Sequence, residues 1–523
     1  MNDELQRSVK ELQLNDLDKP YFIQYVLIDE DEYQAVATFG ALTASDRSRQ
    51  RYVNAQVRVG SYDFDNSEFV TGNGQPSNGG LTTAVIDDDY QTIRHALWLA
   101  TDAAYKQSVE TLARKRAFIR NKVQEEQPPD FSKEKPTNAV ASRRTLQFDQ
   151  AKIESQLREW SKIFRNYPQV QSSSVSARAR LNHRYIVNNE GTHTLQPELV
   201  ISLNVRASTQ ATDGMQLTHV LPINARSFDE LPSTQAVSDS VKQLAADLTA
   251  LKTAPVLDAN YSGPVLLVGQ ASAEMFARVL APNLSGQRAP LSERGGPQSN
   301  ATSLADRMNR PVLPAYISVF DDPAEQRFGE RSLIGHYDVD DQGVPARRVS
   351  LIEDGLLVNL LMSRRPGKDR LQSNGHGRSG DPRREAVQIG NLFVNANAGK
   401  SYEELKKELI ELAKTERLQY GVMIKSIQAG GRGGLGSPVL TYKVYAADGR
   451  EELIRGASIG SLSVQSLRHI QAAGSDAVVA NRLTGSSGAE TPVSVVAPSV
   501  LLEELEIERP SGTQQKPALL SRW

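Results

Sequence analysis

Residues 263–276 read Gly-Pro-Val-Leu-Leu-Val-Gly-Gln-Ala-Ser-Ala-Glu-Met-Phe, an apolar run followed by small and helix-favouring residues. The run at 265–268 is short and is bounded by glycine and proline, which is typical of a buried strand. We predict a helix over 274–280, and Pro282 cuts it short because proline cannot continue the backbone hydrogen-bond pattern. This strand and helix separate two regions of the chain whose hydrophobic patterns differ.

The region before this unit, residues 1–253, has the patterns of an α+β domain. Apolar residues alternate with polar ones over 199–205, as expected for a strand with one buried face. Turn signals at 188–191 and 213–214 place this strand in an antiparallel meander. The other predicted elements are strands over 21–28 and 52–59, a loop over 71–80, and helices over about 89–123, 147–166 and 235–251. We therefore predict an N-terminal α/β domain with long helices and an antiparallel sheet.

The region after this unit completes a C-terminal domain over residues 254–523 and is predicted to be mostly antiparallel β, barrel-like or sandwich-like. Hairpin signals occur at 341–343 and 353–355. Ser401-Tyr402-Glu403-Glu404 is a capping box that opens a helix to about residue 415. Long polar segments over 286–310 and 364–384 are predicted loops.

The charge balance argues against nucleic acid as a partner. The chain has 523 residues, with 60 Lys and Arg against 62 Asp and Glu, so its net charge is only -2. A strongly basic footprint is therefore absent. Arg114, Lys115, Arg116, Arg120 and Lys122 do cluster near the end of the first long helix. Cations suit the C-terminal end of a helix dipole, so we interpret this run as a solvated helix end.

Cysteine content and hydropathy limit the kinds of chemistry and the cellular location to be expected. The chain has no cysteine, which excludes disulfides, thiolate metal ligands and cysteine nucleophiles. No apolar run approaches the roughly 18–20 residues that span a bilayer. The N-terminal residues are polar and lack the regions of a signal peptide. We expect a soluble protein without a membrane partner; a cytoplasmic location is favoured, and a periplasmic one stays open if a signal peptide was removed.

Several local signatures over about residues 255–500 together resemble the TldD/PmbA (TldE) family, whose older label is modulator of DNA gyrase. The strand and helix at 263–276 look like the family's entry to its metal site. Five further segments follow in the family's order. Asp340-Asp341-Gln342-Gly343-Val344-Pro345-Ala346 resembles the family's "D-D-E-G-V-P-A", Ile352-Glu353-Asp354-Gly355 its "I-E-N-G", and Asn374-Gly375-His376-Gly377-Arg378 its "G-N-G-R". Arg455-Gly456-Ala457-Ser458-Ile459-Gly460 resembles its "R-G-A-x-I-G", and Gly474-Ser475-Asp476 its "G-N-D".

The resemblance implies a metal site whose ligands this chain lacks. Active members carry H-E-x-x-x-H on the helix after the strand, with two imidazoles to hold zinc and a carboxylate to accept a proton from bound water. Aligned on Glu274-Met275-Phe276, the three positions are occupied by Ala277, Arg278 and Pro282. Alanine and proline side chains cannot ligate, and arginine is a permanent cation. The family's third ligand is a cysteine near the C-terminus, and its counterpart region, about 484–487, has none.

Two groups of residues could form a different site. His336, Asp338 and Asp340 alternate along a predicted strand and would face one way, which suits a metal ion, although polar residues are also common at a hairpin. His376, in a glycine-rich loop, could line a peptide cleft or simply be exposed. Gly430, Gly431 and Gly433 lack the G-K-[ST] of a phosphate loop, and they could either pack the backbone tightly or offer an edge to an extended peptide.

These observations predict a catalytically silent, TldE-like subunit of a TldD-type metallopeptidase system, with no cofactor or metal and no catalytic residue of its own. Its expected partners are a second chain, either a TldD-like chain or another copy in a dimer, and unfolded peptide added to exposed strands. An autonomous homodimeric binding or structural protein is the alternative. A third hypothesis is a metallopeptidase that uses an unrecognised site, such as His336 with the acidic hairpin.

Overall fold

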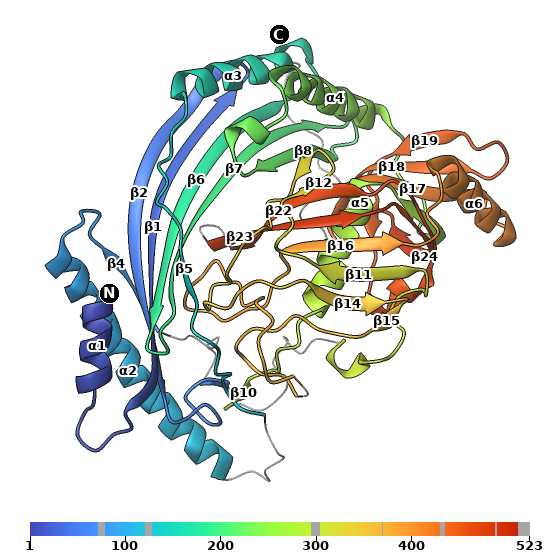
Figure 1. Cartoon of the computed structure of the whole chain (residues 1–523). Coiled ribbons are helices and arrows are strands. Elements are labelled where there is room, and N and C mark those ends of the chain that lie inside the picture. Colours follow the sequence, from blue (N-terminus) through green and yellow to red (C-terminus); the bar gives the residue numbers. More distant parts are fainter. Residues whose placement is uncertain are drawn as a thin grey trace.

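The computed structural model of this protein describes residues 1–71, 79–120, 128–293, 304–368, 370–428, 435–486 and 489–510. Its helices and mostly antiparallel sheets form the mixed α+β fold that the sequence predicts. Figure 1 shows a long curved sheet wrapped around a second body of shorter sheets. The later part of the chain therefore lies inside the curve of the earlier part.

The curved sheet contains strands that lie between residues 20 and 225. Its order is β4-β2-β1-β6-β7-β5, with β8 paired to β7, and only the pairing of β5 with β7 is parallel. Its strands are β1 (Pro20–Thr38), β2 (Ala41–Val59), β4 (Gly80–Ala84), β5 (Asn138–Val140), β6 (Ser172–Asn188), β7 (His193–Gln210) and β8 (Gln216–Ala225). The predicted turns at 188–191 and 213–214 join β6 to β7 and β7 to β8, which confirms the meander.

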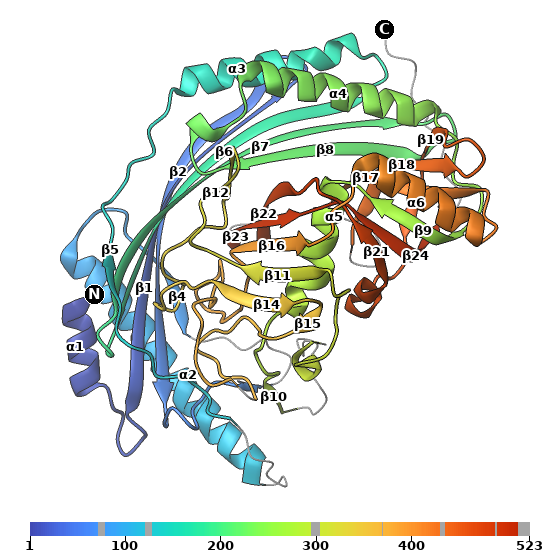
Figure 2. The same ribbon diagram turned by 45° about the vertical axis from the view of Figure 1, so that its right-hand side comes forward.

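Helices cover the convex side of this sheet (Figures 1 and 2). α2 packs on β2 and β4, α3 on β1 and β6, and α4 on β7 and β8. The helices and helical turns of this half are α1 (Asn2–Glu11), α2 (Tyr90–Arg120), α3 (Gln150–Lys162), η1 (Ile163–Asn166), η2 (Phe228–Glu230) and α4 (Thr234–Thr253). The three long helices predicted from sequence are therefore confirmed, within a few residues at their ends.

The alternation of side chains along the strands decides which face meets the helices. Successive side chains of a strand point to opposite faces. Odd-numbered residues of β1, β6 and β7, such as Tyr33 and Leu203, are buried with Trp160 of α3 in one apolar core. Even-numbered residues of the same strands include Glu30 and Arg180. The sheet thus has an apolar convex face and a polar concave face.

The basic cluster at the end of α2 is not a solvated helix end throughout, which corrects that prediction for one residue. The Lys115 side chain is only 1% exposed. Its ammonium group donates to the Asp130 carboxylate at 2.6 Å and to the backbone carbonyls of Asp65 and Ser67 at 3.0 and 2.7 Å. These partners come from distant segments, so spacing along the helix could not reveal them.

The C-terminal half contains two larger sheets that lie within the curve (Figure 2). The first has the order β15-β14-β11-β16-β23-β22, and the second β19-β18-β17-β9-β24-β20 with β21 paired to β24. The first contains β11 (Ile317–Asp321), β14 (Val349–Glu353), β15 (Leu356–Leu357), β16 (Asn391–Ala396), β22 (Val478–Ser486) and β23 (Ala489–Ala497). The second contains β9 (Tyr261–Leu267), β17 (Tyr420–Gln428), β18 (Ser437–Tyr445), β19 (Glu451–Ile454), β20 (Ser458–Ile459), β21 (Ile470–Ala473) and β24 (Val500–Glu508).

Short elements complete this half and tie it to the curved sheet. β3 (Phe69–Val70) pairs in parallel with β10 (Leu291–Ser292), which joins the two halves of the chain. The others are β12 (Arg327–Phe328), β13 (Arg331–Ser332), η5 (Ala305–Arg307) and η6 (Val464–His469). The predicted domain boundary at residues 253 and 254 falls between α4 and β9 and stays a prediction.

The strand and helix at 263–276 form β9 and α5 (Gln270–Met275). The helix does not end before Pro282, because it continues as a π-helical turn, η3 (Phe276–Leu280), and a 3-10 turn, η4 (Ala281–Asn283). α6 (Tyr402–Thr415) begins at the predicted capping box: the Ser401 side chain accepts from the Glu404 backbone N–H, and the Glu404 side chain accepts from that of Ser401. The prediction of this helix is confirmed.

Candidate functional site

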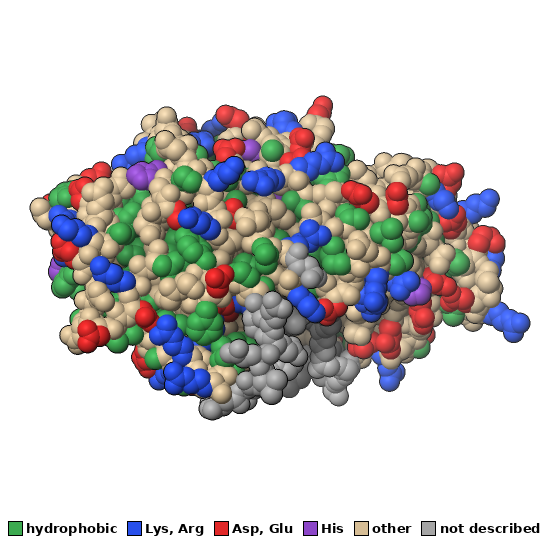
Figure 3. Space-filling model, turned by 60° about the horizontal axis from the view of Figure 1, so that its bottom comes forward, with side chains coloured by type: hydrophobic (Ala, Val, Ile, Leu, Met, Phe, Trp, Pro, Cys, Tyr) green, Lys and Arg blue, Asp and Glu red, His purple; other side chains and the backbone are tan. Residues whose placement is uncertain are grey.

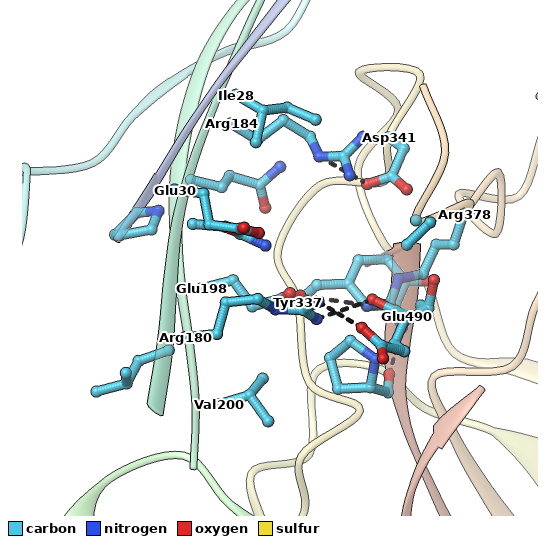
Figure 4. Close-up of a pocket in the computed structure, with 18 of the residues that line it drawn as sticks. Ile28, Glu30, Arg180, Arg184, Glu198, Val200, Tyr337, Asp341, Arg378 and Glu490 are labelled. Carbon is cyan, nitrogen blue, oxygen red and sulfur yellow. Dashed lines mark hydrogen bonds and ion pairs between the residues drawn. The ribbon is translucent and has the colours of Figure 1, made fainter. Parts of the chain in front are cut away.

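A cavity of about 660 Å³ lies between the concave face of the curved sheet and loops of the C-terminal half. We call it the central cavity. One wall consists mainly of residues from β1, β2, β6 and β7, and the other of residues within 334–341, 378–383 and 489–492. The remaining lining residues are Leu81, Ala139, Ala141, Arg144 and Arg226. Figure 4 shows Glu30, Arg180 and Glu198 projecting from the sheet toward Tyr337 and Glu490 on the opposite wall. Its volume falls within the roughly 300–1,000 Å³ of small-ligand pockets.

Strand register sets the chemistry of the sheet wall. Glu30 of β1 lies opposite Asn182 of β6, which in turn lies opposite Glu198 of β7. In the next even-numbered row, Glu32 lies opposite Arg180. Cross-strand partners share a face, so these polar side chains line the cavity side by side. The wall is therefore a charged array with both signs.

Ion pairs cross the cavity and connect the two halves of the chain. The Glu490 carboxylate of β23 accepts from Arg180 at 2.6 Å and from Arg178 at 3.2 Å. Burial disfavours the ionised form of Glu490, but the charges of the two arginines outweigh it and lower the pKa of this carboxyl. Arg184 lies 3.5 Å from Asp341 on the opposite wall. These contacts fix the C-terminal sheets against the curved sheet.

Two other polar groups in the cavity lack a hydrogen-bond partner. The Asn182 side-chain oxygen is buried and lacks a hydrogen-bond partner. The Glu30 carboxylate has no hydrogen bond or ion pair within the described part of the chain, and burial raises its pKa against the charges of Arg180 and Arg178. Buried polar groups normally find partners, so an unpartnered group in a cavity indicates a place where a ligand can bind.

His336 lines the central cavity, but it does not form the predicted metal-binding row with Asp338 and Asp340. Residues 336–340 are irregular rather than a strand, which corrects that prediction. The Asp338 side chain is 84% exposed and lies 3.9 Å from His336, whereas Asp340 is fully buried. The segment lies against loops rather than a paired strand, so its side chains do not alternate between two faces.

The ring orientation of His336 follows from one hydrogen bond. Its Nδ1 lies 2.8 Å from the Pro323 carbonyl oxygen, which can only accept, so Nδ1 carries a proton. In the neutral ring, Nε2 is therefore an acceptor. Burial and then the nearby charge of Arg226 lower the pKa of His336.

Asp340 has a structural position. It accepts the backbone N–H groups of Gln342, Val344 and Gly377 at 2.8 to 2.9 Å. Burial nevertheless raises its pKa to about 7. The carboxyl organises the turn over 341–343 and the glycine-rich loop beside it, and it does not face the central cavity.

His376 is buried, contrary to its interpretation as an exposed loop residue. Its side chain is 0% exposed, and its Nε2 lies 3.3 Å from the equally buried Asp321 carboxylate. Asp321 also accepts the backbone N–H of Gly390. Because Asp321 lies in β11, far away in sequence, spacing could not predict this pairing. His376 does not belong to the lining of the central cavity.

The positions Ala277, Arg278 and Pro282 lie on the helical turns after α5. Ala277 and Arg278 belong to η3, and Pro282 belongs to η4. The Arg278 Nε donates to the Glu274 carboxylate at 2.8 Å, and the Arg482 Nε of β22 lies 3.4 Å from the same carboxylate. None of these residues lines the central cavity.

The glycine cluster of Gly430, Gly431 and Gly433 lies outside the described residues, between β17 and β18. Of the region proposed as the counterpart of the third metal ligand, Thr484 lies in β22. Sequence reasoning missed the arginines of the cavity wall. Arg178, Arg180 and Arg184 all occupy even positions of one strand, and this period-2 pattern of charge was the signal that could have identified them.

The surface agrees with the balanced charge. On the face shown in Figure 3, Lys and Arg side chains intermingle with Asp and Glu side chains. A continuous basic tract of the kind that binds nucleic acid does not appear on that face. Within the described part of the chain, no helix is long and apolar enough to cross a membrane.

Comparison with known sequences identifies the C-terminal half. The model of the PmbA/TldA metallopeptidase C-terminal domain matches residues 260–509. A metalloprotease of Archaeoglobus fulgidus is 27% identical over 209 residues, 38% of this chain and 44% of that protein. A metalloprotease of Methanothermobacter thermautotrophicus is 25% identical over 203 residues, 38% and 41% of the two chains. The matched part thus spans less than half the length of these curated relatives.

Solved structures share the fold over nearly the whole chain. TldE from Thermococcus kodakarensis has a TM-score of 0.61 at 13% identity, over 93% of this chain and 97% of that one. A candidate modulator of a DNA gyrase from Thermotoga maritima has a TM-score of 0.58 at 16% identity, over 93% and 96%. At these identities the likeness concerns the fold alone.

The fold and the domain match define a metallopeptidase-related α+β protein. Residues 260–509 belong to the PmbA/TldA metallopeptidase C-terminal domain family, and the chain has the fold of a solved TldE.

Proposed function

We propose that this chain is a catalytically silent, TldE-like subunit of a TldD-type metallopeptidase system. The observation that carries the proposal is the set of side chains after α5. The family resemblance assigns the two histidines and the glutamate of H-E-x-x-x-H to the positions of Ala277, Arg278 and Pro282. Neither alanine nor proline offers a lone pair to a metal ion, and this chain has no cysteine to serve as the third ligand.

The surroundings of Arg278 do not fit zinc either. Glu274 is the acidic group near this position, and it already faces two guanidinium groups, those of Arg278 and Arg482. Burial, and then the charge of Arg278, lower the pKa of Arg482, while Glu274 opposes them. Two cations against one anion leave a positive environment, which opposes a dication. These residues therefore do not fit a zinc ion that activates water for hydrolysis.

A role in an assembly is supported by the likeness to a solved TldE over 93% of this chain. In the family, metal-bearing and metal-lacking chains can pair, with the silent chain completing an enclosed cavity. The charged cavity between the two halves of this chain could contribute such a space for unfolded peptide. The partner would then supply the metal ligands and the general base that this chain lacks.

The proposal is tested with untagged full-length protein, alone and mixed with an H-E-x-x-x-H relative from the same organism. We expect the chain alone not to cleave an internally quenched, unstructured peptide, with or without chelator. We expect the mixture to elute as one complex and to cleave the peptide in a chelator-sensitive way. As the control, the relative alone measures the background cleavage.

Two results would overturn the proposal. Chelator-sensitive cleavage by the isolated chain would show a metal site elsewhere. Failure to form a complex with the relative, together with a homodimeric native mass, would favour the autonomous binding protein.

A further inference from the structure

One cation in the central cavity has the acids Glu230, Glu198 and Asp338 near it but no ion pair with any of them. Arg226 follows the last residue of β8 and lines the cavity. Its backbone N–H donates to the Glu230 carboxylate at 2.9 Å, but its guanidinium group has no hydrogen bond or ion pair within the described part of the chain. Burial lowers the pKa of Arg226, although nearby acids raise it. A desolvated cation without a partner is costly, which indicates that an anion can bind beside it.

A second guanidinium group reaches the same part of the cavity. Arg144, on the exposed segment between β5 and α3, also lines the cavity, and its side chain has no partner among the residues described. Both arginines line the cavity, and the charge of Arg144 lowers the pKa of Arg226. His336 lines the cavity nearby, and the charge of Arg226 lowers its pKa as well. An anion between these groups would relieve the repulsion.

The charge of the whole lining limits the kind of anion. The cavity lining contains as many arginine residues as Asp and Glu residues together. A multiply charged phosphate would meet the acidic groups as well as the arginines. A single planar carboxylate, in contrast, matches the fork of a guanidinium group. The lining therefore favours a carboxylate attached to an uncharged or zwitterionic molecule.

Unpartnered acceptors lie across the sheet from Arg226. Arg226 directly follows Ala225, which pairs with Ile201 of β7, so Arg226 stands at the β8 side of this wall. Asn182, with its unpartnered oxygen, is one strand away from Glu198, and Glu30 is one strand further. The three strand spacings from β8 to β1 are about 14 Å, the length of roughly four extended residues. A ligand with a carboxylate at one end and N–H donors along its length would satisfy all of these groups.

We propose that the central cavity binds short peptides by their free C-terminal carboxylate, with Arg226 and Arg144 holding the carboxylate and Asn182 and Glu30 accepting N–H groups of the peptide. This inference deepens the peptide-binding part of the proposed function and rests on it. It adds that the chain end, rather than a side-chain sequence, is the feature recognised. Carboxyl-terminal fragments and small peptides are then the expected ligands.

Calorimetric titration of the full-length chain with tetra-alanine and with its C-terminal amide tests this inference. The two probes differ only in the anionic end. We expect the free acid to bind at least about tenfold more tightly, because only the acid can form a charge-assisted hydrogen bond with a guanidinium group. R226Q should remove the preference, and R144Q should reduce it. R206Q is the matched control, because Arg206 of β7 is exposed and lies outside the cavity lining.

Each contrary result has a separate meaning. Equal affinity of the acid and the amide would overturn the carboxylate site and leave peptide binding in place. Absence of binding for both probes would overturn this inference and the peptide-binding part of the proposed function, but not catalytic silence, which the cleavage assay tests. Stronger competition by inorganic phosphate than by acetate would also overturn it, in favour of a phosphate site.

Discussion

Arg278 and Arg226 are two partly buried arginines whose surroundings differ in one respect. Arg278 has a carboxylate of its own chain, Glu274, at 2.8 Å. Arg226 lines a cavity and has no such partner within the described residues. A guanidinium group held in an ion pair contributes to structure, whereas one that lines a cavity without an ion pair is available for a ligand. Arg278 therefore has a structural contact, whereas Arg226 is the arginine for which we propose a ligand.

The largest effect is expected from removing the internal counter-charge. E274Q would leave Arg278 and Arg482 facing each other without an anion. Because breaking a buried ion pair leaves an uncompensated charge, we expect a loss of about 2–4 kcal/mol in the free energy of unfolding. Urea denaturation measures it. E411Q, which removes an exposed pair with Lys414, should cost less than about 1 kcal/mol, and equal losses in both variants would contradict the comparison.

A smaller effect on stability is expected from removing Glu490, whose ion pairs with Arg180 and Arg178 connect the two walls of the cavity. The pKa of Glu490 is lowered in the folded protein by Arg180 and Arg178. Its contribution is therefore present above the unfolded-state pKa and is lost as the pH falls through the lowered folded-state pKa. We expect E490Q to cost about 2 kcal/mol near neutral pH. Unfolding measured from neutral to acidic pH should show this difference shrinking, and a difference independent of pH would contradict it.

The smallest effect on stability is expected at Arg226. R226Q removes a desolvated cation that has no partner in the described chain. We expect the free energy of unfolding to stay within about 0.5 kcal/mol of the wild type or to rise. Thermal unfolding of the two proteins measures this directly. A loss above about 1 kcal/mol would mean that Arg226 is neutralised within the protein, and the comparison with Arg278 would fail.

Much of the fold follows from local pattern. The alternation over 199–205 is strand β7, the turn signals give the meander, and Ser401 to Glu404 is the capping box of α6. These features depend on residues that are close in sequence. The helix after β9 begins at Gln270, before its predicted start, and a π-helical turn and a 3-10 turn continue it through Pro282.

The candidate site could be predicted only in part, because its members meet through tertiary structure. Glu30, Arg180, Arg226 and Glu490 come from four distant segments, and only the period-2 charge of β6 indicated a charged wall. The same reason explains the errors at Lys115 and His376, whose acidic partners lie far away in sequence or on another element. His336 was expected on a strand because its segment alternates, but no neighbouring strand pairs with it in the described structure.

The central claim is that the family's metal site is lost in this chain. Elemental analysis of untagged protein, purified without chelators and beside an H-E-x-x-x-H relative, tests it most directly. We predict no stoichiometric transition metal in this chain and a stoichiometric metal in the relative. A stoichiometric metal that this chain retains on dialysis would contradict the claim.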